Sequence, residues 1–335
     1  MILDLLTLLD ELIDNPVDDS LIVDDKPVLL LVDLSYISHR GIQSQGERTI
    51  TLSNSVFNAL RLIFNIVGRY GCTEAIICTD SHPYKRSEIH EDYKADRRER
   101  EEDAVEHLVT VKQIVSTAMM QLSTPVIEIE GAEADDLIAH FVRTNLDKRV
   151  VILSSDSDLH ALQDVHNDLI QAYPTIGKGG ENTEINKSTL AIKYPEAKGQ
   201  FWKLTLLHII GGGHNFGYQI PNVGTIKAWR VIEQIPENIT NARDALDWLY
   251  KSAVRFPGKT GLVKAYTTML NVNYTLNQFP LVSLKLEEET FLKPALNLDN
   301  LDLMAVYLRG AAELVPASIA SMLEKCNIPH DIDIK

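Results

Sequence analysis

Hydrophobic positions in the first half of the chain form short runs that are separated by amphipathic stretches. Four runs have the length and composition of buried strands: 28–32 (VLLLV), 74–79 (EAIICT), 126–129 (VIEI) and 149–153 (RVVIL). Near-continuous apolar strands are typical of a parallel sheet that helices cover on both faces. The pattern therefore predicts an α/β fold with a mostly parallel central sheet flanked by helices.

Helical periodicity connects these strands. Residues 53–67 have the period of a helix with caps at Ser53 and Gly68, and 125–158 is typical of a strand–helix–strand unit. Apolar residues at Leu137, Ile138 and Phe141 give the helix of that unit its buried face.

The chain changes character near residue 200. A buried-type helix at 201–210 (FWKLTLLHII) is followed by a glycine-rich loop at 211–224 and a helix at 225–235 with Lys227 and Arg230 near its start. This order resembles a helix-hairpin-helix, which binds the backbone of duplex DNA through main-chain amides and helix N-termini.

Three parts are expected from these patterns. Residues 1–26 form an acidic amphipathic extension, 27–200 the α/β core, and 201–335 a helical region with the helix-hairpin-helix at 201–235. The extension either folds back on its own core or docks on a partner; the sequence leaves both open.

Acidic residues follow each of the four predicted strands. They are Asp33, Asp80, the group Glu133, Asp135 and Asp136, and the pair Asp156 and Asp158. Any one of them could be an ordinary helix cap or turn residue. The carboxyl ends of parallel strands meet at one edge of a sheet, however, so these acids should converge. Carboxylates suit hard divalent cations, which predicts a site for Mg²⁺, with Mn²⁺ as a substitute.

Residues 81–106 alternate basic side chains with acidic ones and with tyrosines. They include Tyr93, Lys94, Arg97 and Arg98. The segment is either a solvent-exposed helix with many ion pairs or a nucleic-acid-binding element. In the second case its cations bind phosphates and a tyrosine ring stacks on a nucleobase.

Composition narrows the function classes. The formal net charge of −15 argues against polyanion binding driven by net charge alone, but leaves room for local basic sites. Three scattered cysteines indicate a reducing cytoplasm rather than a disulfide framework. No apolar run approaches the roughly 18 residues of a membrane span. The PGKT at 257–260 lacks the first glycine and the preceding strand of a P-loop.

Several sequence blocks resemble the signature blocks of the flap endonuclease or 5′-nuclease superfamily, and within it the bacteriophage ribonuclease H enzymes. In chain order the blocks are VDLSYI, CTD, YKADR at 93–97, GAEADDLIAH and ILSSDSDLHAL, and the likeness covers roughly residues 28–235. The combination of the last two blocks is much more specific than either alone.

The resemblance implies a PIN-like core, a helical arch over the site and a helix-three-turn-helix that grips duplex DNA through a monovalent ion such as K⁺. It implies metal-dependent hydrolysis of phosphodiesters at 5′ ends, flaps and RNA primers during replication. The implied metal ligands are Asp33, Asp80, Glu133, Asp135, Asp156 and Asp158, with Asp136 in or just outside the first shell.

Other roles follow from the same resemblance. Asp33 and Asp156 act in catalysis with Lys94 and Arg97, which help to position the scissile phosphate. The implied nucleic-acid contacts are Tyr93, Lys94, Arg97, Arg98, Gly213, Asn215, Gly224, Lys227 and Arg230. The expected partners are DNA with a 5′ flap or an RNA–DNA primer junction, and replication proteins such as single-stranded DNA-binding protein. We expect a monomer in the cytoplasm, that of the host if a phage encodes it.

One departure from the family pattern leaves the function open. Asn215 and Tyr218 stand where the family has two aspartates of the second metal position, and no acid occurs between Glu196 and Glu233. Without these two aspartates the second metal site should be poorer in negative charge. This matters because in two-metal hydrolysis both ions stabilise the attacking and leaving oxygens. The chain is thus a structure-specific 5′-nuclease or, alternatively, a branched-DNA binding protein with weakened or lost catalysis. A PIN-type ribonuclease would leave 211–230 unexplained.

Overall fold

The structure is a computed structural model, and it describes residues 26–43, 50–94, 102–174, 182–212, 218–258, 261–278, 281 and 294–332. The predicted extension up to residue 25, Arg97, Arg98, Gly213 and Asn215 lie outside the described residues. Within the described ranges, no helix combines the length and apolarity needed to cross a bilayer.

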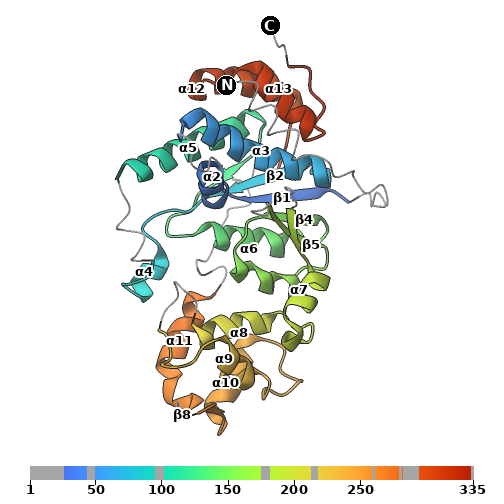
Figure 1. Ribbon diagram of the computed structural model, residues 1–335. Helices are drawn as coiled ribbons and strands as arrows, with labels where there is room; N and C mark the ends of the chain where they lie inside the picture. The colour runs from blue at the N-terminus through green and yellow to red at the C-terminus, as the bar shows by residue number, and fades with distance from the viewer. Residues whose placement is uncertain are drawn as a thin grey trace.

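A six-stranded sheet forms the centre of the upper part of the molecule in Figure 1, with the strand order β3-β2-β1-β4-β5-β6. The strands are β1 (Val28–Asp33), β2 (Glu74–Cys78), β3 (Val126–Ile127), β4 (Arg149–Leu153), β5 (Leu169–Pro174) and β6 (Asn182–Ile185). All neighbouring pairs are parallel except β5 with β6. The mostly parallel sheet flanked by helices is confirmed.

The strands at the centre of the sheet are apolar on both faces. On β1, Leu30 and Val32 belong to one apolar cluster, while Leu29 and Leu31 belong to another on the opposite face. This explains why the run VLLLV shows no polar alternation, since neither face meets water. The strands of the predicted unit at 125–158 are not neighbours, because β1 and β2 lie between β3 and β4.

Helices cover both faces of the sheet. One face carries α2 (Leu34–Gln43), α3 (Leu52–Tyr70) and α5 (Glu102–Gln121), and the other carries α6 (Ala134–Thr144) and the 3₁₀ helix η2 (Ser157–Asp164). The short helix α4 (Lys85–Ile89) lies apart from the sheet (Figure 1).

Helix α3 is longer than the sequence predicted. Thr51 caps its start by accepting a hydrogen bond from the Asn54 N–H at 3.2 Å, and Gly71 ends it in the left-handed region at φ 61°. The predicted cap Gly68 lies inside the helix instead. A Cβ there would stand 1.7 Å from the carbonyl oxygen of Cys326, so this glycine permits close packing of the C-terminal segment.

A second lobe lies below the sheet in Figure 1 and has its own apolar cluster, drawn from residues 185–270. Its helices are α7 (Lys187–Lys193), η3 (Pro195–Ala197), α8 (Trp202–Gly211), α9 (Thr225–Ile232), α10 (Ala242–Lys251), η4 (Val263–Tyr266) and α11 (Thr267–Leu276). A two-stranded sheet of β7 (Arg255–Phe256) and β8 (Gly261–Leu262) completes it.

The last helices return to the core. After η6 (Leu298–Asn300), helices α12 (Leu301–Ala312) and α13 (Pro316–Lys325) join the apolar cluster of α3 and α5. The packing therefore departs from the predicted helical region at 201–335. The sequence could not reveal this, because an amphipathic helix does not encode which apolar surface it covers.

Candidate active site

Three aspartates lie where the strands in the middle of the sheet end. Asp33 is the last residue of β1, Asp80 follows β2 and Asp156 follows β4. Since β1 lies between β2 and β4, this edge is the topological switch point at which open α/β sheets bind ligands. The Ser154 hydroxyl donates to the Asp33 carboxylate at 3.1 Å and joins two of the strand ends.

Asp80 connects the end of β2 to the first turn of α6. Its carboxylate accepts hydrogen bonds from the Ala134 N–H at 3.0 Å and from the Ser35 hydroxyl, and Lys112 Nζ lies 3.9 Å away. Burial raises the pKa of Asp80, but Lys112 and these two hydrogen bonds outweigh it, so the pKa lies below its usual value. Asp80 is thus ionised at neutral pH.

The other acids at this edge are destabilised in their charged form. Burial and the charge of Asp80 raise the pKa of Asp33 to about 7. Burial and the charges of Asp156 and Asp33 raise the pKa of Asp135 well above its usual value, and burial raises the pKa of Asp156 as well. A divalent cation among these carboxylates would relieve both the burial and the repulsion.

The donor set fits a hard cation, although the side chains do not surround one point. Among the residues that the structure describes, no group of three or more His, Cys, Asp or Glu side chains is arranged to hold a metal ion. The metal-ligand assignment therefore stays a prediction. The carboxylate oxygens and the raised pKa values of Asp33, Asp135 and Asp156 support it.

We expect the protein to lose stability with rising pH when divalent ions are absent. Because the pKa of Asp33 rises from 3.8 to about 7 on folding, the folded chain keeps a proton that the unfolded chain releases. The stability from this proton is full below pH 3.8 and is lost as the pH passes about 7. At 1.36 kcal/mol per pKa unit the loss is at most about 4 kcal/mol.

Thermal unfolding in EDTA at about pH 5.5 and about pH 8 measures this effect. The control variant Asp33→Asn should show a weaker pH dependence, which comes from Asp135 and Asp156 alone, and Mg²⁺ should restore the stability of the original protein at the higher pH. A melting temperature that rises with pH and ignores Mg²⁺ would contradict a cation site.

Glu133, just before α6, faces these acids but is held by three protein donors. Its carboxylate accepts hydrogen bonds from Arg86 and from the Tyr93 hydroxyl, both at 2.8 Å, and from Lys94 Nζ. Lys94 Nζ also lies 5.2 and 5.1 Å from the ring centroids of Tyr84 and Tyr93. Glu133 thus connects the segment around α4 to the acidic edge.

Comparisons with known proteins agree with this geometry. Residues 28–194 match the family described as 5′-3′ exonuclease, N-terminal resolvase-like domain. The chain belongs to the flap endonuclease and 5′-nuclease superfamily.

Two curated relatives and two solved structures show the extent of the likeness. DNA polymerase I of Mycobacterium leprae is 28% identical over 257 residues, which are 71% of this chain and 27% of that protein. The 5′-3′ exonuclease of Aquifex aeolicus is 28% identical over 125 residues, 36% of this chain and 41% of that protein. The chain therefore matches less than half the length of either.

The solved structures show the same fold. T5 5′-exonuclease with bound zinc has a TM-score of 0.58 at 16% identity, covering 89% of this chain and 99% of that one. The bacteriophage T5 flap endonuclease in a complex with DNA and metal ions has a TM-score of 0.57 at 15% identity, covering 90% and 99%.

Lys94 lies beside the acids, and Tyr93 departs from its predicted use. The Tyr93 side chain is 3% exposed and packs with Tyr84 and Leu276. A base cannot stack on a ring that is buried in this way, so Tyr93 instead supports Glu133 and Lys94. Lys94 has φ 50°, a left-handed conformation that is uncommon outside glycine and often marks functional sites.

Asp136 is bound on all sides. Its carboxylate accepts two hydrogen bonds from Arg86 at 2.6 and 2.9 Å, one from the Glu133 N–H at 3.0 Å and one from the Leu281 N–H at 2.8 Å. A carboxylate offers about four lone-pair sites, and all are used. Of the two predicted places for Asp136, in or just outside the metal's first shell, these four hydrogen bonds favour the outer one.

Asp158 turns toward the helical lobe. One carboxylate oxygen lies 2.8 Å from His208 Nδ1 on α8, and the other is buried with no hydrogen-bond partner among the described residues. Burial lowers the pKa of His208, but the hydrogen bond and charge of Asp158 outweigh it and raise the pKa. Sequence reasoning missed His208, whose signal was a lone histidine near the end of an apolar helix.

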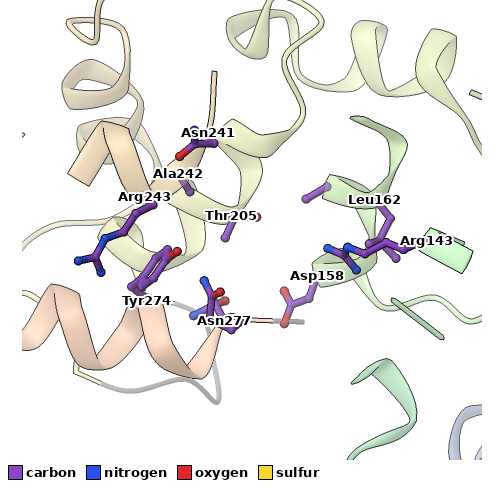
Figure 2. Close-up of a pocket in the computed structure, with 11 residues that line it drawn as sticks. Arg143, Asp158, Leu162, Thr205, Asn241, Ala242, Arg243, Tyr274 and Asn277 are labelled. Atoms are coloured by element: carbon purple, nitrogen blue, oxygen red, sulfur yellow. The ribbon is translucent and has the colours of Figure 1, made fainter. Parts of the chain in front are cut away.

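Asp158 also borders a cavity of about 180 Å³ between the sheet and the helical lobe. Figure 2 shows Asp158 between Arg143 and Asn277, with Arg243 and Tyr274 on the far side. The unpartnered oxygen of Asp158 makes this side chain available to a cation.

Helices α8 and α9 lie where the sequence predicts the duplex-binding element, whose binding role stays a prediction. Gly212 follows α8 with φ 72°, and α9 begins after Gly224 with no acid in its first turn. Lys227 Nζ donates to the Asn222 carbonyl at 2.6 Å, and Arg230 is exposed. The acid-free N-terminus of α9, with Lys227 in its first turn, suits a phosphate backbone, while Arg230 lies in the last turn of the helix.

We expect Lys227→Gln and Arg230→Gln to weaken duplex binding for all sequences alike. Each lost phosphate contact should reduce the slope of log affinity against log salt by about 1. Titrations of a labelled duplex at several salt concentrations measure the slope. The control Lys251→Gln changes the net charge equally at an exposed residue of α10 and should keep the slope. An unchanged slope in both test variants would remove this element from the duplex interface.

Proposed function

We propose that this chain is a structure-specific, divalent-metal-dependent 5′-nuclease that hydrolyses phosphodiesters at flaps or in RNA–DNA primers. The observation that carries the proposal is the buried acidic edge at the switch point of the sheet, with the Lys94 ammonium beside it. Burying Asp33, Asp135 and Asp156 together costs stability, and a cation bound among them would offset this cost.

Asp33, Asp135 and Asp156 would hold the ion, and Asp158 offers it a further free oxygen. The bound ion supplies charge neutralisation at the reacting phosphate. Asp80 fixes the first turn of α6, so that Asp135 is presented from a rigid helix. Lys94, hydrogen-bonded to Glu133, places its ammonium where it can donate to a phosphate oxygen as negative charge develops.

The depleted second position favours a second candidate function. Tyr218 has a phenol where the family resemblance implies an aspartate, and the sequence from 197 to 232 contains no acid. A chain with one weakened ion position could recognise branched DNA without cutting it. For the nuclease we also propose a potassium ion at the duplex-binding element. Its proposed protein partner is a single-stranded DNA-binding protein.

Cleavage of a 5′-labelled flap and of an RNA–DNA hybrid, first in Mg²⁺ and then in Mn²⁺, tests the two candidates. We expect products in Mg²⁺ that Asp156→Ala does not form. Cutting only in Mn²⁺ would mean that the depleted position limits the reaction. Tight duplex binding with no product in either metal would instead identify a binding protein.

A further inference from the structure

Helix α11 (Thr267–Leu276) contacts the duplex-binding element through one fully buried asparagine. The Asn273 amide donates to the Tyr218 carbonyl at 2.8 Å and accepts from the Tyr218 N–H at 2.7 Å. The same amide nitrogen donates to the Ile209 carbonyl at 2.9 Å, near the end of α8. Asn273 therefore joins the end of α8 to Tyr218, which lies in the segment between α8 and α9.

One turn further along, the end of α11 contacts the active site. The buried Arg86 guanidinium donates to the carbonyls of Leu276 at 2.9 Å and Gln278 at 2.8 Å. Its other N–H groups bind Glu133 and Asp136, before and within the first turn of α6. A single side chain with no exposed surface thus joins α11 to the helix that presents Asp135.

Two further contacts run in parallel with this connection. The Leu281 N–H, after α11, donates to Asp136 at 2.8 Å. The Tyr218 ring meets His90, at the end of α4, edge to face with centroids 4.9 Å apart. The residue that Asn273 clamps therefore also touches the segment that carries Arg86 and Lys94.

We infer that α11 couples duplex engagement to the arrangement of the catalytic acids, with Asn273 and Arg86 as positioning residues. Phosphates that bind residues 218–224 and the start of α9 pull on Tyr218, and Asn273 passes the displacement to α11. A one-turn segment of helix moves as a unit, so the Leu276 carbonyl moves Arg86 and with it Glu133, which holds Lys94. Buried, fully paired polar networks transmit such shifts because breaking any one bond is costly.

This inference deepens the proposed function and rests on it, so its first test does not depend on cleavage. Hydrogen exchange is measured in EDTA with and without a saturating duplex that has no flap. We expect the duplex to slow exchange of the Glu133 and Leu281 amides, which donate to Asp136. Asn273→Ala should lose this protection at saturating duplex.

Asn271→Ala is the matched control, since Asn271 is an exposed asparagine on the same helix that accepts from the Tyr250 hydroxyl at 3.0 Å. It should keep the protection. No protection in the original protein, or equal protection in Asn273→Ala, overturns the coupling. If Asn273→Ala fails to fold, Asn273→Leu fills the same space but removes the hydrogen bonds to Tyr218 and Ile209, and unchanged protection in that variant overturns the coupling equally.

The second test compares single-turnover cleavage of one flap strand with and without its duplex. We expect the duplex to stimulate the original protein within the roughly 5- to 150-fold range typical of coupled sites. Asn273→Ala should lower the rate with duplex toward that of the strand alone, which stays unchanged. If the duplex slows amide exchange but no strand is cut, the nuclease function is wrong and the coupling stands. If the strand is cut and the duplex stimulates Asn273→Ala as much as the original protein, the nuclease function stands and the coupling is wrong.

Discussion

Asp33→Asn is expected to abolish cleavage while stabilising the metal-free protein. The asparagine keeps an oxygen that accepts from the Tyr36 N–H, which lies 2.9 Å from the present carboxylate. It removes one of the buried charges that raise the pKa values at this edge, so the folded chain gains stability above about pH 7. Activity should fall by at least about 100-fold, since even partners outside the ligand shell typically cost ~10–100-fold.

Single-turnover cleavage and urea unfolding near pH 8 measure the two effects, and a duplex titration verifies that binding is intact. Asp168→Asn is a suitable control, because Asp168 pairs with Arg149 at 3.0 Å just before β5, at the opposite edge of the sheet. It should leave cleavage unchanged. If Asp33→Asn cuts at the original rate, the acidic edge does not hold the catalytic ion.

Arg86→Met is expected to lower the free energy of unfolding by about 3–5 kcal/mol, the usual cost of breaking a buried ion pair on one side. The methionine fills the space but leaves Asp136 buried without the bidentate partner that lies at 2.6 and 2.9 Å. The double variant Arg86→Met with Asp136→Leu should recover part of the loss, because it removes the stranded charge as well.

Urea unfolding of both variants measures this cost. Arg243→Met provides the control: Arg243 is 59% exposed, its nearest acid Asp247 is 3.7 Å away, and the change should fall within about 0.5 kcal/mol. A loss for Arg86→Met as small as that of Arg243→Met would show that the buried network is not maintained in solution.

The sheet could be predicted because its strands are buried on both faces. VLLLV and RVVIL carry no polar alternation, so their burial was readable from the letters alone. Since the acids directly follow these runs, the carboxyl edge of a parallel sheet gathered Asp33, Asp80 and Asp156 without any further information. Local patterns were sufficient wherever the chain neighbours decided the structure.

The sequence failed where a distant residue decided the outcome. Asp135 and Asp136 are adjacent in the chain, but only Asp136 meets Arg86, fifty positions earlier. Tyr93 is buried because Leu276 of α11 covers it, and Asp158 turns to His208 of α8. None of these contacts leaves a periodic trace, since each depends on how the helical lobe meets the sheet.

The C-terminal helices show the same limit in packing. Leu308 and Leu323 lie in the apolar cluster of β1 and α3. The carbonyl of Cys326 packs so close to Gly68 that a Cβ at this position would clash with it. The glycine was visible in the sequence as a candidate cap. Its use as a contact surface depends on a segment more than two hundred residues away, which local patterns cannot supply.

This return of the chain has a consequence for synthesis. The apolar cluster on the α3 face of the sheet takes side chains from both sides of the helical lobe, up to Ile332, so it stays incomplete until α12 and α13 have been synthesised. The lobe at 185–270 has its cluster in one continuous stretch and can fold first. A nascent chain that ends before α12 therefore exposes the part of the α3 face that α12 and α13 cover in the folded protein.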